Sequence, residues 1–427
     1  MLFCSCASRR IGKRLRFTRR MAYNDDAAPS LLRQENTPML SQRMKNLHPY
    51  VPGEQPKDRD YIKLNANENP YPPSPLVQKA VARAVRTQRT RLGLYPDPDS
   101  LALREAVAEL LNRTGGVLCR TQCEGGAKNG SGAFCTPETA DHIPFAVTSD
   151  MIYCGNGSDE VLSFVFYAFF DSDRPLVLPA HTYSFYPVYA GFYQIPLDAV
   201  PLRDDWSLDR ERMLSDAAAT DSGIIFANPN APTGLTLRRA EVREMLRRAP
   251  RHRVFVVDEA YADFGGESCI PLLAEFPNLV VVRTFSKSLC GAGMRLGYLV
   301  ASPDLVNAVT TVKNSLNHFP VDFLAQQAGI AACADAGYYA RCAKRIVHER
   351  DTFIDFLRSK GWFVLPSATN FVFARKDGAD GETLYRRIKD GGILVRHFAT
   401  SGIADFLRIT VGTPAQMQAL RAVMENL

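Results

Sequence analysis

Residues 279–297 of the chain read LVVVRTFSKSLCGAGMRLG. The first part, Leu279–Arg283, is a short apolar run of the kind that forms a strand buried inside a sheet. Lys287 follows shortly after this strand. The end of a strand in a buried sheet is shielded from water, which disfavours an unpaired charge. This position indicates an amine that works in its neutral form, as a Schiff-base lysine does. The alternative is a surface lysine in a glycine-rich turn.

Two other residues of the same stretch suit a phosphate group. Ser286 has a hydroxyl that can donate a hydrogen bond. Arg295 has a guanidinium, which can bind a phosphate through two parallel hydrogen bonds. We therefore predict that a phosphate group is bound beside Lys287.

Apolar runs elsewhere in the chain extend this strand into a sheet. They lie at Met151–Cys154, Leu176–Leu178, Gly223–Ala227 and Val254–Val257, and apparent helices separate several of them. Continuous apolar strands that alternate with helices predict a parallel sheet covered on both faces. In such sheets the ligand lies at the carboxyl ends of the strands. From about Val321, long helices and then strands near residues 370–374 and 406–411 predict a second, smaller domain.

The strand at residues 254–257 is followed by polar residues in the sequence DEAY. A carboxylate at Asp258 can hold the positive charge of a protonated pyridine nitrogen, and Tyr261 can donate to the 3-oxygen of such a ring. The alternatives are an aspartate that caps a helix and a half-buried core tyrosine.

Three further motifs follow apolar runs: GNGSDE at 155–160, HTYSF at 181–185 and NPNAPTG at 228–234. The first opens a helix, where the free N–H groups around Ser158 and Asp159 suit a phosphate. Tyr183 could stack on a planar ring, and Asn230 could hydrogen-bond a ring hydroxyl. Each motif is weak alone, because such turns and aromatic residues are common in proteins of many kinds.

Together, the order and spacing of these motifs with Ser286, Lys287 and Arg295 resemble those of fold-type-I aminotransferases. The resemblance runs from about Lys45 to the C-terminus. Within that superfamily the chain is most similar to the histidinol-phosphate aminotransferases. The supporting pieces are HPYVPG (48–53), LNANENP (64–70), LYP (94–96), GILVR (392–396) and LRITVGT (407–413).

The resemblance implies the fold class α/β, as a fold-type-I transferase that depends on pyridoxal 5′-phosphate. It implies a large domain with a mostly parallel central sheet covered by helices, and a smaller α+β C-terminal domain. We expect a basic leader over 1–45, an N-terminal arm over 46–75, the large cofactor-binding domain over 76–320 and the small domain over 321–427. The turn-rich stretch 115–149 is expected to be an inserted surface loop.

The resemblance also implies a role for each matching residue. Lys287 forms the Schiff base and, with Asp258 and Tyr261, makes up the catalytic set. The other cofactor-binding residues are Ser158, Asp159, Tyr183, Asn230, Ser286, Arg295 and, across a homodimer with shared active sites, Tyr95. Arg408 is expected to bind the carboxylate of glutamate or 2-oxoglutarate. Arg396, Tyr50 and Asn69 are expected to favour the phosphate of the second substrate. For Arg396 an ordinary surface ion pair is the alternative.

The chain departs from the family pattern at one loop. The family usually has asparagine immediately before Pro-Thr-Gly, and this chain has Ala231. Asn230 lies one residue earlier, so either Asn230 in a shifted loop or Tyr261 alone would contact the 3-oxygen.

The implied reaction is the transamination of L-histidinol phosphate with 2-oxoglutarate, which gives imidazole-acetol phosphate and L-glutamate in histidine biosynthesis. The alternatives are an aminotransferase for aromatic amino acids and a related phospho-amino-acid decarboxylase. A cofactor-binding regulatory protein without turnover is a fourth reading, against which Lys287, Asp258 and Arg408 argue.

The net charge of +6 comes from the N-terminus. Residues 1–20 hold seven Lys and Arg and no acid, so the rest has 44 basic and 45 acidic residues. This balance gives no reason to expect nucleic acid. The leader could be a targeting peptide, a contact for anionic surfaces, or a start upstream of Met21.

No apolar run is long enough to span a membrane. We expect a cytoplasmic protein, with organellar import directed by the leader as the alternative. Scattered cysteines without paired CxxC spacing, among them Cys119, Cys123 and Cys135, lead us to expect no metal site.

Overall fold

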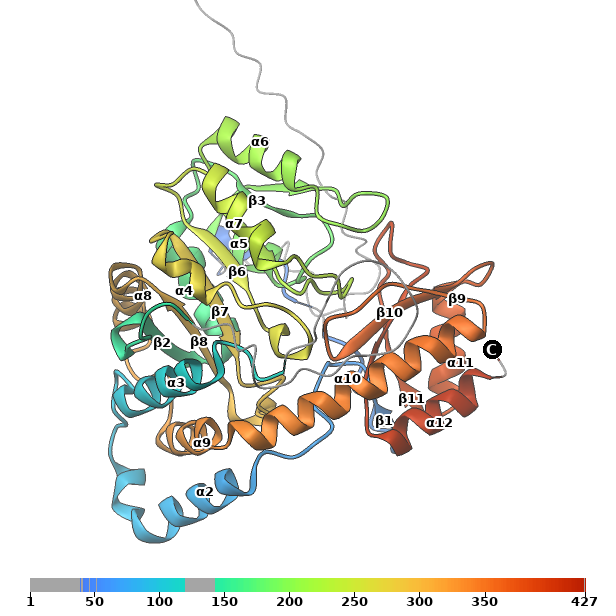
Figure 1. Cartoon of the computed structure of the whole chain (residues 1–427), viewed down its shortest axis with the longest axis horizontal. Coiled ribbons are helices and arrows are strands. Elements are labelled where there is room, and N and C mark those ends of the chain that lie inside the picture. The colour runs from blue at the N-terminus through green and yellow to red at the C-terminus, as the bar shows by residue number, and fades with distance from the viewer. Residues whose placement is uncertain (1–38, 40, 46, 51, 120–142, 426) are drawn as a thin grey trace, which may run out of the picture.

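The structure is a computed structural model that describes residues 39, 41–45, 47–50, 52–119, 143–425 and 427. Figure 1 shows a large body around one sheet and a smaller body around another, with the long helix α10 (Ala336–Ser359) running from one to the other. The predicted α/β class is confirmed by a seven-stranded sheet with helices on both faces. The domain boundaries stay predictions.

The large sheet has the strand order β2-β8-β7-β6-β5-β3-β4. Its strands are β2 (Ile152–Asn156), β3 (Leu176–Pro179), β4 (Leu197–Val200), β5 (Ile224–Ala227), β6 (Phe255–Asp258), β7 (Leu279–Thr284) and β8 (Leu296–Ala301). All neighbouring pairs are parallel except those of β8, which is antiparallel to β2 and β7. The prediction of a mostly parallel sheet is therefore confirmed, although β4 and β8 were not foreseen.

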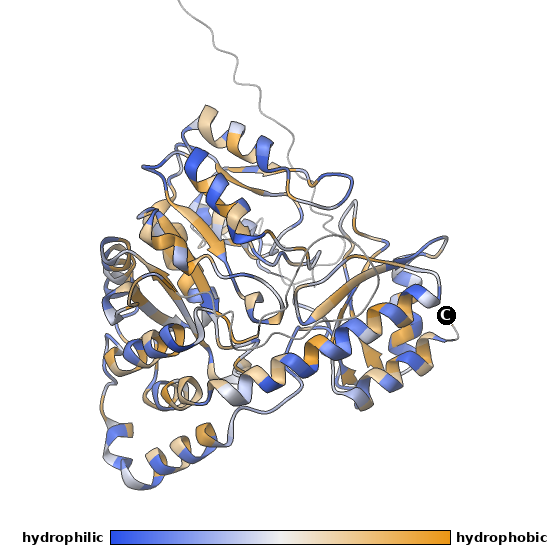
Figure 2. Cartoon of the chain, viewed as in Figure 1, coloured by the Kyte–Doolittle hydropathy of each residue, from blue (hydrophilic) through white to orange (hydrophobic). Residues whose placement is uncertain are grey.

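Alternate residues of the central strands pack on opposite faces, as the two-residue period of a strand requires. Phe255 and Val257 of β6 join one buried cluster, and Val256 joins the other. Helices α3 (Leu101–Thr114), α6 (Arg210–Thr220), α7 (Arg239–Arg248) and α9 (Phe323–Ala334) contribute to the first cluster. Helices α4 (Gly157–Phe169), α5 (Tyr186–Tyr193) and α8 (Pro303–Leu316) contribute to the second. Figure 2 shows the result as apolar strands beneath helices of mixed polarity.

The smaller body has a four-stranded antiparallel sheet of order β12-β13-β10-β9. Its strands are β9 (Trp362–Val364), β10 (Phe371–Lys376), β12 (Arg396–His397) and β13 (Leu407–Thr410), beside α11 (Gly381–Asp390) and α12 (Pro414–Met424). The N-terminal arm joins this body, because β1 (Ile62–Lys63) pairs with β11 (Ile393–Leu394) and the Thr410 N–H donates to the Leu64 carbonyl at 2.9 Å.

Two helices lead from the N-terminal arm into the large body. Helix α2 (Pro75–Thr87) is followed by the 3-10 turn η3 (Arg89–Gly93). Helix α3 begins at Leu101, after Ser100, which has the left-handed backbone angle φ 48°. Tyr95 therefore lies in the connection between the two helices.

The predicted surface insert 115–149 is buried at both ends. Val117, Cys119, Ile143 and Val147 are buried. The Gly116 carbonyl accepts from Arg283, and the Leu118 N–H donates to Asp263 at 2.8 Å. Residues 120–142 lie outside the described part of the chain, as do Cys123, Cys135 and nearly all of the predicted leader. Within the described residues, no helix is long and apolar enough to cross a membrane.

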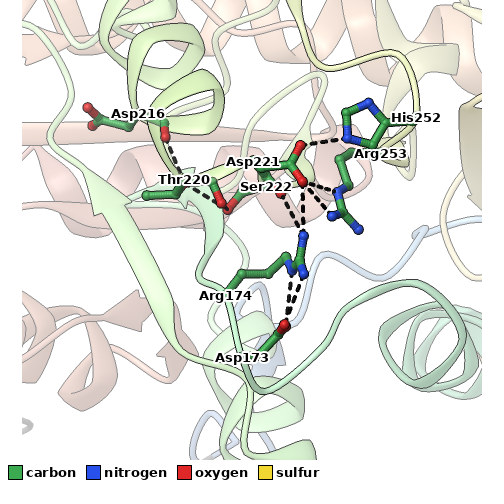
Figure 3. A network of polar contacts seen from close by, with 8 residues as sticks. All are labelled: Asp173, Arg174, Asp216, Thr220, Asp221, Ser222, His252 and Arg253. Atoms are coloured by element: carbon green, nitrogen blue, oxygen red, sulfur yellow. Dashed lines mark hydrogen bonds and ion pairs between the residues drawn. The ribbon is translucent and has the colours of Figure 1, made fainter.

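One polar network ties together the amino ends of three neighbouring strands (Figure 3). Asp221, which precedes β5, accepts from Arg174 before β3 at 3.0 Å and from Arg253 before β6 at 2.5 Å. His252 Nε2 lies 2.6 Å from the same carboxylate. Asp221 itself has φ 50°, a left-handed conformation that aspartate tolerates better than most residues. The network therefore fixes the sheet at the edge away from the predicted site.

Replacing Asp221 with glycine keeps the backbone angle available and removes the carboxylate. Because the partly exposed Arg174 and Arg253 then lose their shared acceptor, we expect the free energy of unfolding to fall by about 1–2 kcal/mol. Asp221→Asn, which keeps one acceptor oxygen, should cost less. Thermal or urea unfolding at low and high salt measures both variants. An unchanged Asp221→Gly protein would show that the network contributes nothing to stability.

Candidate active site

The predicted motifs converge at the carboxyl edge of the large sheet. Asp258 ends β6, Lys287 follows β7, and the loops after β3 and β5 carry Tyr183 and Asn230. Arg295 immediately precedes β8, which begins at this edge because it runs against its neighbours. Residues far apart in the sequence therefore surround one place, as expected for a parallel sheet.

Lys287 is half-buried and its amine faces polar groups from other segments. Its Nζ donates to the Ala66 carbonyl at 3.2 Å and lies 5.9 Å from the centre of the Tyr261 ring. Burial, helped by the charge of Arg408, lowers the pKa of Lys287 from 10.5 to about 8. About a tenth of the amine is therefore neutral at pH 7, far more than for an exposed lysine, and the neutral form is the one that acts as a nucleophile.

Asn69 holds the lysine from the other side. Its amide donates to the Lys287 backbone carbonyl at 2.8 Å, and its side-chain oxygen accepts from the Tyr71 N–H at 3.1 Å. The side chain predicted to contact substrate phosphate thus anchors the backbone of the lysine in this structure. Its predicted substrate role stays a prediction.

Asp258 is 5% exposed and hydrogen-bonded to neutral donors. Tyr186 donates its hydroxyl at 2.9 Å, and the Ala260 N–H donates at 3.1 Å. Burial raises the pKa of Asp258 from 3.8 to about 6, and these two hydrogen bonds oppose the rise. Among the described residues Asp258 forms no ion pair, so a cationic partner at this place would lower the cost of its charge.

A cradle for an anion lies where α4 begins. Arg295 Nη2 pairs with Asp159 at 2.9 Å, and the Tyr183 hydroxyl donates to the other oxygen of Asp159 at 3.0 Å. Gly157 has φ 79°, and a Cβ there would lie 2.6 Å from Arg295 Nη2. The backbone can approach the guanidinium only because residue 157 is glycine.

The two serines predicted to bind phosphate lie in segments close to this cradle. Ser158 is the second residue of α4, where helix N–H groups are free to bind an anion. A Cβ at Gly297 would lie 2.3 Å from the Ser158 backbone nitrogen, so β8 packs directly against this turn. Ser286 is 9% exposed, and its backbone N–H donates to the Thr284 hydroxyl at 3.1 Å.

The small sheet places two arginines directly opposite each other, since Arg408 of β13 pairs in register with Arg396 of β12. Arg408 donates to the Asn65 carbonyl at 3.2 Å, while its Nε is buried without a hydrogen-bond partner. Phe371 and Phe398 lie 5.4 and 5.5 Å from its guanidinium carbon. Like charges on paired strands repel each other, and an anion bound between them would relieve that cost.

Arg408 and Tyr261 lie close enough for the charge state of each to affect the pKa of the other. Burial raises the pKa of Tyr261, whereas Arg408 and a hydrogen bond from Asn67 lower it. Burial lowers the pKa of Arg408, and Tyr261, Tyr50 and Arg396 are among the groups that act on it. The ring of Tyr50 lies 4.9 Å from that of Phe185, two residues after Tyr183.

Two predicted residues lie apart from this set of contacts. Tyr95 is 80% exposed and stacks on Phe319 with 4.5 Å between ring centres. The Asn230 amide donates to the His181 carbonyl and to the Thr233 hydroxyl, each at 3.0 Å. One amide proton of Asn230 therefore joins its loop to the loop after β3, and the other holds Thr233 within its own loop. The predicted cofactor role of Asn230 stays a prediction.

Sequence reasoning missed the segment Asn65–Asn67, whose backbone or side chains contact Arg408, Lys287 and Tyr261. The alternation of asparagines in LNANENP was the available signal, because asparagine is enriched where the backbone is left-handed. Asn67 has φ 54°. The motif was used only to support the resemblance, without a site role for Asn67.

The sequence matches the family Aminotransferase class I and II over residues 59–423. The chain belongs to this family. It is 45% identical to a histidinol-phosphate aminotransferase of Syntrophus aciditrophicus over 91% of this chain and 98% of that protein. It is 42% identical to a histidinol-phosphate aminotransferase of Chromohalobacter salexigens over 90% of this chain and 97% of that one. The predicted resemblance is confirmed.

Solved aminotransferase structures share the fold. The histidinol-phosphate aminotransferase of Sinorhizobium meliloti, solved with pyridoxal 5′-phosphate, superposes with a TM-score of 0.74 at 24% identity, over 91% of this chain and 98% of that one. A Thermus thermophilus aspartate aminotransferase mutant superposes with a TM-score of 0.72 at 20% identity, over the same shares of the two chains. The predicted fold-type-I architecture is confirmed.

The lowered pKa of Lys287 has a consequence for this aminotransferase without cofactor. Below pH 8 the folded protein holds a charged, desolvated amine, and that cost disappears as the pH rises from about 8 to 10.5. Lys287→Met should therefore raise the free energy of unfolding by about 1–2 kcal/mol at pH 7. The gain should shrink by pH 10. Urea unfolding at both pH values measures this, and a pH-independent difference would contradict the burial effect.

Proposed function

We propose that the protein transfers an amino group between L-histidinol phosphate and 2-oxoglutarate, giving imidazole-acetol phosphate and L-glutamate, with pyridoxal 5′-phosphate as cofactor. The observation that carries the proposal is the meeting of Lys287, Asp258 and Arg408 in one site. The chain around that site is 45% identical to a histidinol-phosphate aminotransferase along almost its whole length.

The residues of the site fit pyridoxal phosphate group by group. The buried carboxylate of Asp258, held by neutral donors, suits a protonated pyridine nitrogen. Arg295, Ser286 and the start of α4 suit the phosphate, and the amine of Lys287 suits the aldehyde. When bound, the cofactor supplies an electron sink that stabilises negative charge at the substrate Cα.

The protein's own side chains position the substrate and move its proton. Lys287, with its pKa lowered to about 8, is a base that can accept the proton from the substrate Cα near neutral pH. Burial raises the pKa of Asp258 to about 6, so a cation beside it would stabilise the carboxylate, and Asp258 favours the protonated ring nitrogen. Tyr261, 8% exposed, would donate its hydroxyl proton to the ring's 3-oxygen.

The two arginines divide the substrates' anionic groups between them. Arg408, whose Nε is buried without a hydrogen-bond partner, suits the α-carboxylate of glutamate. Arg396 lies opposite Arg408 on the paired strand. Together with Tyr50, it suits the phosphate of histidinol phosphate or the second carboxylate of glutamate. Because a guanidinium binds a carboxylate or a phosphate in the same planar geometry, one arginine can serve both substrates.

A homodimer with shared active sites is part of the proposal. Tyr95 is 80% exposed, and Leu92, Leu94 and Leu316 are exposed apolar side chains on the adjoining segments. Such a surface is typical of a protein–protein contact. Tyr95 of one protomer would then reach the phosphate of the cofactor held by the other.

The substrate is tested by a half-reaction followed in a spectrophotometer. The cofactor-loaded enzyme is mixed separately with histidinol phosphate, histidinol and phenylalanine, and the loss of its visible absorbance is timed. We expect fast bleaching by histidinol phosphate alone. Equal or faster bleaching by phenylalanine would make the protein a broad aromatic aminotransferase, and release of carbon dioxide would make it a decarboxylase. Lys287→Ala should remove both the absorbance band and turnover.

The role of Arg408 is tested with a matched arginine on the neighbouring strand. Arg408→Met should lower kcat/KM for glutamate by about 100-fold or more, because a charge-assisted double hydrogen bond is lost. Arg375 of β10 is partly exposed and pairs with Asp377 at 3.0 Å, so Arg375→Met removes a guanidinium from the same sheet outside the site. Equal effects of the two changes would argue against a carboxylate contact by Arg408.

A further inference from the structure

Tyr261 has neighbours in the NPNAPTG loop that offer its hydroxyl no hydrogen-bond donor. Ala231 is buried in the same apolar cluster as Tyr261 and has no polar side-chain atom. Asn230 uses both amide protons on His181 and Thr233. The donor for the phenol comes from another part of the chain.

That donor is Asn67 of the N-terminal arm. Its Nδ2 lies 2.9 Å from the Tyr261 hydroxyl, and the side chains of both residues are buried. The contact joins residues 194 positions apart. It links the arm, whose Leu64 carbonyl accepts from Thr410 of the small sheet, to the loop after β6 of the large sheet.

Thr410 fixes which way the Asn67 amide faces. The Asn67 backbone N–H donates to the Thr410 hydroxyl at 2.9 Å, and that hydroxyl donates to Asn67 Oδ1 at 3.1 Å. Because the oxygen of the amide is used by Thr410, the NH₂ group must face Tyr261. The phenol oxygen then accepts a hydrogen bond from Asn67, and the phenol's own proton stays available for a different acceptor.

The backbone holds Asn67 in this orientation. Its φ of 54° lies in the left-handed region, which asparagine tolerates and most side chains do not. The Asn370 amide donates to the Asn67 carbonyl at 3.0 Å. Four hydrogen bonds thus involve this one residue, and Thr410, which makes two of them, lies on the strand of Arg408.

We propose that Asn67 is a positioning residue that sets the direction of the Tyr261 hydroxyl, so that the phenol proton points at the cofactor's 3-oxygen. The inference rests on the proposed function and adds a residue to it. In this chain the amide of Asn67, in the arm, binds Tyr261 and so supports the contact with the 3-oxygen indirectly. The loop that carries Ala231 supplies no such amide.

The test is a pH titration of the cofactor-loaded enzyme, followed by its visible absorbance. That absorbance changes around the pH at which the nitrogen contributed by Lys287 loses its proton. The pH at which half of the change has occurred is the midpoint of the titration. A hydrogen bond from Tyr261 draws negative charge from the neighbouring 3-oxygen, which then holds that proton less strongly. Asn67→Gly, which tolerates the left-handed backbone, should raise the midpoint by about half a pH unit or more. The dissociation constant for pyridoxal phosphate, measured by dialysis, should rise as well.

A second variant keeps the proposal testable if the glycine protein folds poorly. Asn67→Asp has nearly the same shape and keeps the oxygen that Thr410 needs, but it accepts the phenol proton instead of donating. We expect it to raise the midpoint at least as much as Asn67→Gly. Gln194→Gly is the matched control, because Gln194 is exposed and has φ 60°. It should leave the midpoint unchanged.

A double-mutant cycle separates positioning from general destabilisation. In a Tyr261→Phe background there is no hydroxyl to direct, so adding Asn67→Gly should not shift the midpoint further. An unshifted midpoint in both single variants, or additive shifts in the double variant, would overturn the proposal. A wild-type protein that binds no cofactor, or Lys287→Ala with normal absorbance, would instead overturn the proposed function.

Discussion

The arrangement of this site depends on the cost of removing two charged groups, Lys287 and Asp258, from water at the carboxyl edge of the large sheet. Lys287 and Asp258 both lie in places that disfavour their charged forms, as the opposite shifts of their pKa values show. Without ligand this is a cost in stability, and a ligand with complementary charges removes it. The site therefore favours a ligand that places a positive charge beside Asp258 and reacts with or binds the neutral amine of Lys287.

Buried ion pairs beneath the site hold the segment that carries the lysine. Arg283 of β7 contacts Glu259 at 2.8 Å and Asp263 at 3.4 Å, and its Nη2 donates to the Gly116 carbonyl. Asp263 also accepts from the hydroxyl of Ser288, the residue after Lys287, at 2.5 Å. Loss of one partner would leave a buried charge uncompensated. The N-terminal end of the 115–149 stretch is thus connected through Asp263 to the loop that carries Lys287.

Local sequence predicted the central strands and the residues at their ends, because a buried strand reads as a continuous apolar run. It did not predict β4, a half-buried edge strand that includes Asp198, or β8, which begins inside a glycine-rich stretch. Roles that depend on distant partners were also missed. The contact between Asn67 and Tyr261, and the use of both Asn230 amide protons on His181 and Thr233, follow from the three-dimensional arrangement and leave no local pattern.

The arm makes the two halves of the site depend on each other. Two residues of the arm, Asn65 and Asn67, contact two residues of β13 with the same spacing. Arg408 donates to the Asn65 carbonyl, and the Asn67 N–H donates to the Thr410 hydroxyl. Between them, the Ala66 carbonyl accepts from Lys287. An anion that draws Arg408 toward it must therefore act on the same short segment that contacts Lys287 and Tyr261. The contacts of Arg408, Lys287 and Tyr261 are thus linked through three consecutive residues of the arm.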